Sequence, residues 1–268
     1  MKGLLLIAFL AFSSSCFGQC KMIRYPYRIQ PTIIIGFPIG QFAAKSNTNH
    51  LAEQAMSGGG GGAGIYKSFN TRWTGGMFIH AVSYALDKNR VLPIISKRYE
   101  VPGCFVNSDF VYSNVDIIYW GLGGSYAVTK ERVGIEPYIR GGVAFGSLVD
   151  KTYTFGKIHR KKENDNFSEQ ITLRSDGNNA FFFYAVGLSA NVRLNKWLYF
   201  FGNAHFTNGT YRQLLSEHST DYLGNLTNIG SFVVQQPITS IQVEFGTQFR
   251  LRIPALPKKS SSSEHNKH

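Results

Sequence analysis

The chain has 268 residues and a net charge of +12, with 28 glycines, 14% aromatic residues and only 16% charged residues. After the export signal described below, no apolar run reaches the roughly 18 residues that a transmembrane helix needs, which excludes such a helix. The basic residues are scattered apart from one run at 159–162, so nucleic acid is not expected as a partner. High aromatic and glycine content with few charges is typical of a β-barrel that faces lipid.

The first residues have the pattern of an export signal, which we place at residues 1–18. Lys2 supplies the positive charge, residues 4–12 form an apolar stretch too short to span a membrane, and small residues follow. We expect cleavage after Gly18. A lipoprotein anchored through Cys16 is the alternative, but the usual aliphatic residue three positions before that cysteine is missing.

Eight segments alternate apolar and polar residues, which predicts β-strands with one apolar and one polar face. The last segment is the clearest, because Ile241, Val243 and Phe245 alternate with Gln242 and Glu244. The periodicity leaves open which face meets lipid, and the export signal favours the apolar one. In chain order the segments are residues 29–39, 62–69, 73–86, 116–128, 135–147, 182–194, 198–206 and 237–251.

The links between these segments alternate in length. Those near residues 70, 131 and 195 are short, whereas those at about 41–61, 87–115, 149–179 and 208–236 are long. Outer-membrane barrels have short periplasmic turns and long external loops. We therefore predict an all-β protein, an eight-stranded antiparallel up-and-down transmembrane β-barrel with four long extracellular loops and short periplasmic turns. It occupies residues 19–253, and residues 254–268 form a disordered periplasmic tail.

Three local features accompany this topology. Trp73 and Trp197 lie beside short turns, where they are expected to form an interfacial girdle, although two ordinary core tryptophans are the alternative. The five glycines at 58–62 lack the Lys-Ser/Thr of a phosphate-binding loop and are expected to form a flexible loop before the second strand. Cys20 and Cys104 fall on opposite sides of the membrane, so we predict that they form no disulfide.

The chain resembles a family at its signal, at its alternating segments and at its terminal strand. Residues 17–19 (Phe-Gly-Gln) and 245–251 (Phe-Gly-Thr-Gln-Phe-Arg-Leu) are similar to those of small outer-membrane β-barrel proteins of Bacteroidetes, often labelled PorT-like. The resemblance covers about residues 18–253. It implies outer-membrane lipid and the barrel-insertion machinery as partners, and an envelope or secretion protein as a further one. The polar tail after Ile253 departs from the family, whose last strand usually ends the chain on an aromatic residue.

Six charged or titratable residues fall on the polar faces of the predicted strands. We expect them to form an ion-pair cluster that fills a narrow lumen, because an eight-stranded barrel is about as wide as its side chains. A polar path or a small-ligand site is the alternative. The six residues are Glu136, Arg140, Arg193, His205, Glu244 and Arg250.

The function favoured by these features is non-enzymatic: a surface scaffold whose long loops bind a partner, with a secretion or envelope assembly as the setting that the resemblance implies. Binding of a small solute in the barrel lumen, or its passage through the lumen, is the alternative. An acyl-transfer or hydrolase site at Ser216, His218 and Asp221 is a third hypothesis. No cofactor is expected, and the histidines show no recognisable metal-binding spacing. The loop aromatics that suit recognition are Phe105, Phe110, Tyr112, Tyr153, Phe155, Tyr211 and Tyr222.

Overall fold

The computed structural model describes twelve parts of the chain: residues 26–43, 55–87, 89, 97, 104–110, 114–128, 133–147, 156–162, 168–175, 179–220, 223 and 225–251. The expectations for the export signal, for Cys20 and for the C-terminal tail concern residues outside these ranges.

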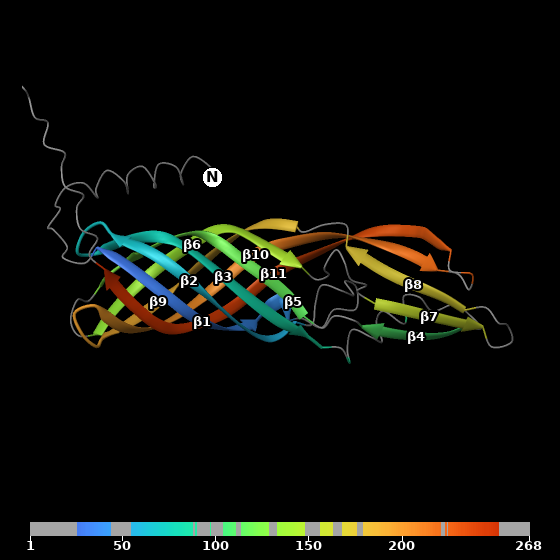
Figure 1. The fold of residues 1–268 in the computed structure, drawn as a ribbon, viewed down its shortest axis with the longest axis horizontal. Coiled ribbons are helices and arrows are strands. Elements are labelled where there is room, and N and C mark those ends of the chain that lie inside the picture. Colours follow the sequence, from blue (N-terminus) through green and yellow to red (C-terminus); the bar gives the residue numbers. More distant parts are fainter. Residues whose placement is uncertain are drawn as a thin grey trace, which may run out of the picture.

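Eight strands form a closed antiparallel ring, in the order β11-β1-β2-β3-β5-β6-β9-β10 and back to β11 (Figure 1). The predicted fold class is thus confirmed. Closure pairs Ile33 of β1 with Phe245 of β11, which removes the free edges of an open sheet. The strands are β1 (Tyr27–Pro38), β2 (Ala55–Ser68), β3 (Trp73–Leu86), β5 (Asn114–Tyr126), β6 (Val133–Ser147), β9 (Asn179–Arg193), β10 (Leu198–Thr220) and β11 (Leu226–Leu251).

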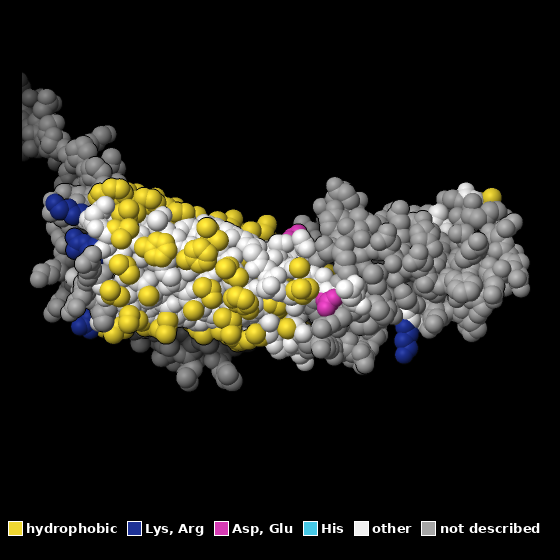
Figure 2. All heavy atoms as spheres, turned by 90° about the horizontal axis from the view of Figure 1, so that it is seen from below, with side chains coloured by type: hydrophobic (Ala, Val, Ile, Leu, Met, Phe, Trp, Pro, Cys, Tyr) yellow, Lys and Arg dark blue, Asp and Glu magenta, His cyan; other side chains and the backbone are white. Residues whose placement is uncertain are grey.

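The outer wall of the ring is apolar. Along β1 the exposed residues Ile33, Ile35 and Phe37 alternate with the buried residues Thr32 and Ile34. Figure 2 shows hydrophobic side chains over the barrel, with Lys and Arg at the end that holds the short turns. Because every backbone group in such a ring is paired, the apolar wall can lie in lipid. The short turns mark the periplasmic end.

Among the described residues, no helix has both the length and the apolar character needed to cross a membrane.

The strands β10 and β11 continue past the external rim as one long hairpin. Pairing of β10 with β9 ends at Gly209, and farther along Leu215–Thr220 pairs instead with β8 (Ser168–Ser175). The strands β7 (Gly156–Lys162) and β4 (Cys104–Phe110) complete this external sheet (Figure 1). The long links at about 87–115, 149–179 and 208–236 therefore contain strands of this external sheet, for which β10 supplies a hydrogen-bonding edge. Cys104 begins β4, on the external side as predicted.

The glycine run 58–62 was expected to be a flexible loop, and this expectation is wrong. The run lies inside β2 and pairs with β1 on one side and β3 on the other. A Cβ placed on Gly60 would lie 1.9 Å from the carbonyl oxygen of Ala81, whereas one on Gly59 would meet no atom within 4 Å. The inward glycines thus let β2 and β3 approach closely, which a larger residue would prevent.

Candidate functional site

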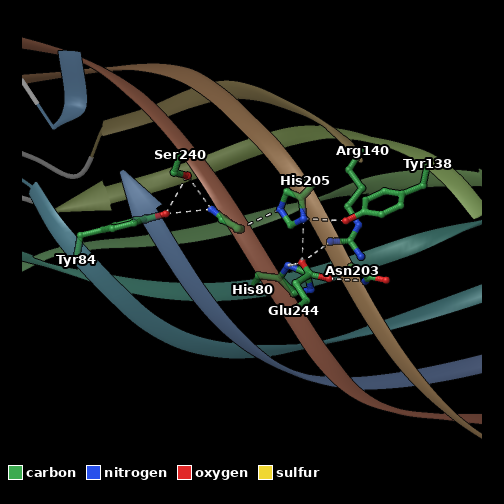
Figure 3. Close-up of polar contacts among 9 residues, drawn as sticks. His80, Tyr84, Tyr138, Arg140, Asn203, His205, Ser240 and Glu244 are labelled. Carbon is green, nitrogen blue, oxygen red and sulfur yellow. Dashed lines mark hydrogen bonds and ion pairs between the residues drawn. The ribbon is translucent and has the colours of Figure 1, made fainter. Parts of the chain in front are cut away.

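The centre of the lumen is organised around one buried carboxylate. Glu244 of β11 is 0% exposed and receives hydrogen bonds from Arg140 of β6 (2.5 Å) and Asn203 of β10 (2.7 Å). The Nδ1 atom of His80 on β3 lies 3.2 Å from the same carboxylate (Figure 3). The guanidinium of Arg140 also lies 4.7 Å from the ring centre of Tyr138. One positive and one negative charge therefore neutralise each other inside the barrel.

A neutral hydrogen-bonded chain extends from this centre toward the external side. Gln242 Nε2 donates to Tyr84 Oη (3.1 Å) and to Ser240 Oγ (3.3 Å), so its Oε1 is left to accept from His205 Nε2 (3.1 Å). His205 Nδ1 then accepts from the Tyr138 hydroxyl at 2.7 Å (Figure 3). These partners assign His205 the neutral tautomer with its proton on Nε2. The chain fixes side chains from several strands across the lumen.

A second ion pair lies nearer the periplasmic end. Arg28 Nη1 of β1 donates to both carboxylate oxygens of Glu136 on β6, each at 3.1 Å, and Ser125 donates to the same carboxylate at 2.9 Å. Arg28 also donates to Ser68. Between the two ion pairs lies a cavity of about 30 Å³ bordered by Arg28, Glu136 and Arg140. This volume is large enough for a water molecule and too small for a larger solute.

The external half of the lumen is apolar and aromatic, which the sequence reasoning missed. The short 3-10 helix η1 (Gly40–Phe42) inserts Phe42 against Tyr84, with ring centres 5.0 Å apart. Phe183 packs edge-on against Tyr119 at 4.9 Å. The available signal was β3, in which apolar residues occupy both faces, a sign of burial on both sides. The buried apolar cluster to which this layer belongs includes Ile34, Phe78, Tyr84, Val115, Ile117, Tyr119, Phe181, Phe183, Tyr211 and Ile238.

The structure brings four of the six predicted lumen residues inside: Glu136, Arg140, His205 and Glu244 are all buried. The other two differ. Arg193 is exposed and donates to the backbone of Asn195, and Arg250 is only partly buried. Both occupy inward positions of their strands, but these positions fall at the strand ends, where the lumen opens to the periplasm. They therefore line its mouth rather than its centre.

The two girdle tryptophans lie beside the short turns, as expected from the sequence. Trp197 is 50% exposed and stacks on Phe249 with ring centres 6.3 Å apart. Trp73 packs edge-on against Tyr126 at 4.7 Å. Their insertion at the lipid headgroups remains a prediction.

Of the three residues in the enzymatic hypothesis, the structure describes Ser216 and His218, which are in contact. His218 Nε2 lies 3.2 Å from Ser216 Oγ on β10, while Asp221 is outside the described residues. No group of three metal-ligating side chains occurs in the described part of the chain.

Tyr211, proposed from the sequence as a recognition residue, is 1% exposed and packs against Phe181, so a partner could not reach it. It faces the lumen because it sits at an inward position of β10.

Neither a protein-family model nor a curated protein matches this chain. It is similar to the outer-membrane protein OprG from Pseudomonas aeruginosa, with TM-score 0.41 and 13% identity over 88% of this chain and 100% of that one. A major outer-membrane protein from Thermus thermophilus gives TM-score 0.40 and 11% identity, over 83% and 99% of the two chains. The attachment invasion locus protein of Yersinia pestis gives 0.33 and 10%, over 84% and 97%. These are likenesses of fold. The closed ring and its apolar wall place the chain in the outer membrane as an eight-stranded β-barrel.

Proposed function

We propose that this protein is a non-enzymatic binding protein of the cell surface, in which the barrel anchors a raised β-structure that contacts a partner. The observation that carries the proposal is the β10–β11 hairpin. Residues 210–220 of β10 lie beyond its pairing with β9, roughly 35 Å of extended chain. A barrel that only filled the membrane would not need this extension or the sheet attached to it.

An exposed apolar patch lies on the outer face of this hairpin. Leu214 and Val233 are paired across the two strands and are 42% and 60% exposed. A polar pair separates them from the lipid-facing wall, because Arg212 donates to Gln235 at 3.0 Å. Apolar residues held above such a polar band lie in water unless a partner covers them. Residues of this kind are typical of protein interfaces.

The second candidate is passage of a small solute through the lumen. The buried ion pairs and the aromatic layer argue against it, since each occupies the cross-section of the barrel at a different level. The two candidates differ in conductance. Purified barrel in a planar lipid bilayer is expected to give no steady current. A large stable conductance would favour solute passage over partner binding.

The binding proposal is tested on intact cells that carry the full-length protein. A photoreactive residue at position 214 is expected to cross-link one defined envelope protein. Val233→Lys should reduce that product at least tenfold, because a charge would be buried at the contact. Thr210→Lys is the matched control, since Thr210 is exposed lower on the same hairpin. Equal cross-linking by both variants, or none by the parent protein, would refute a role for this patch.

The partner that we propose is an envelope or secretion component, of the kind associated with some PorT-like barrels of Bacteroidetes. Identification of the cross-linked product by mass spectrometry tests this assignment separately from the existence of the contact.

A further inference from the structure

Positive charge exceeds negative charge at the periplasmic mouth of the lumen. Arg28 and Arg250 are Cα partners on the neighbouring strands β1 and β11. Arg193 lies at the same end, paired with Tyr199 of β10. Like charges placed opposite each other destabilise a sheet. Both Arg28 and Arg193 repel Arg250, while Glu136 attracts it. Glu136 neutralises Arg28. Within the described residues, Arg193 and Arg250 form no ion pair with a carboxylate.

Two buried donors at this mouth have no acceptor. Gln248, 0% exposed, uses its Oε1 to accept from Gln30 at 2.7 Å, while its Nε2 meets no partner. The Nε of Arg250 is also buried and unpaired. Gln248 and Arg193 are both Cα partners of Tyr199, so the amide and the guanidinium flank the same residue. An unsatisfied buried donor costs about 1–3 kcal/mol, and here unsatisfied donors coincide with surplus positive charge.

Tyr199 holds one of these arginines in a fixed orientation. The guanidinium carbon of Arg250 lies 3.8 Å from the centre of the Tyr199 ring. Stacking of this kind covers one face of the planar guanidinium and makes no use of the N–H donors at its edge, of which Nε has no hydrogen-bond partner. The mouth thus holds one oriented guanidinium, on β11, together with the charge of the exposed Arg193 on β9.

We propose that the periplasmic mouth binds a phosphate-class oxyanion between Arg193, Gln248 and Arg250. Guanidinium groups match the geometry of phosphate oxygens and form charge-assisted hydrogen bonds with them. The bound anion would accept from the unpaired Gln248 and Arg250 donors and would relieve the repulsion between Arg28 and Arg250. Free phosphate and the phosphate of a periplasmic-leaflet phospholipid share this chemistry. The inference is independent of the surface-binding proposal, because it concerns the opposite end of the barrel.

The test uses the full-length barrel in zwitterionic detergent and follows urea unfolding with inorganic phosphate or with chloride at equal ionic strength. Phosphate is expected to raise the unfolding midpoint of the parent protein. Arg250→Gln and Arg193→Gln should each weaken phosphate affinity at least tenfold, which is about 1.4 kcal/mol. Lys67→Gln is the control. Lys67 is an exposed cation at the same end whose Nζ lies 5.9 Å from the Tyr27 ring, outside the lumen.

A second readout separates binding from a purely structural role. In chloride alone, Arg250→Gln should unfold at about the same urea concentration as the parent, since it removes both the repulsion from Arg28 and the stack on Tyr199. An arginine that only supported the fold would lose stability in both salts. The inference is overturned if phosphate protects the parent no better than chloride does and vesicles give no Arg250-dependent effect, or if Arg250→Gln keeps the full phosphate response.

Vesicles distinguish the two sources of the anion. The parent barrel is reconstituted in phosphatidylcholine with or without phosphatidylglycerol. Stabilisation by phosphatidylglycerol that requires Arg250 assigns the site to a lipid phosphate, whereas a response to dissolved phosphate alone assigns it to the free ion. Either result supports the site.

Discussion

Removing the buried arginine at the lumen centre should destabilise the barrel far more than it alters permeability. Arg140 is 6% exposed, pairs with the fully buried Glu244, and stacks 4.9 Å from Phe78 and 4.7 Å from Tyr138. Arg140→Ala leaves a carboxylate buried without its counter-charge. Breaking a buried pair from one side costs about 3–5 kcal/mol. The aromatic layer on the external side still closes the lumen, so conductance should stay near zero.

The measurement is urea unfolding in detergent, followed by tryptophan fluorescence and by electrophoretic mobility of unheated samples. Arg193→Ala, measured in chloride without phosphate, is the control, because it removes the same type of side chain from an exposed position and should change stability by about 0.5 kcal/mol or less. The double variant Arg140→Met/Glu244→Gln removes both charges together and should recover most of the loss, because the amide oxygen introduced at position 244 would still accept from Asn203. The reasoning is refuted if Arg140→Ala costs no more than the control, or if the double variant is as unstable as the single one.

Three further results are expected. Gly60→Ala should cost about 1–3 kcal/mol because its Cβ would lie 1.9 Å from Ala81 O; Gly59→Ala should be neutral in the same unfolding assay, and equal effects would contradict the close approach of β2 and β3. Cys104 should react with a membrane-impermeant thiol reagent on whole cells while Cys20 does not, and an intramolecular Cys20–Cys104 disulfide found by mass spectrometry would overturn the topology. The protein should fractionate with the outer membrane and change its gel mobility on heating, since a closed ring resists detergent; a soluble periplasmic protein with unchanged mobility would exclude the barrel.

The strands and their lipid-facing residues could be predicted from the sequence because they depend on a local rule. Alternate side chains of a strand point to opposite faces. The apolar residues Ile33, Ile35 and Phe37 at every second position therefore predict the outer wall, even when the neighbouring strands are unknown. The alternation of short and long links predicted which end of the barrel faces the periplasm. The same rule failed at the glycine run 58–62, because glycine has no side chain from which a face can be assigned.

The same alternation predicted that Glu136, Arg140, His205 and Glu244 face inward, but the prediction left out Arg28 and His80, which are also buried there. It could not say at what depth these side chains lie or what they contact. Arg140 and Glu244 are 104 positions apart in the chain and hydrogen-bond only because the ring closes. Arg193 also occupies an inward position of its strand, yet it lies at the strand end and therefore lines the periplasmic mouth of the lumen. Ring closure and the stagger between strands set these depths. The sequence by itself therefore determined the wall of the barrel, and the tertiary structure alone decided the contents of its lumen, because contacts across the ring depend on all eight strands at once.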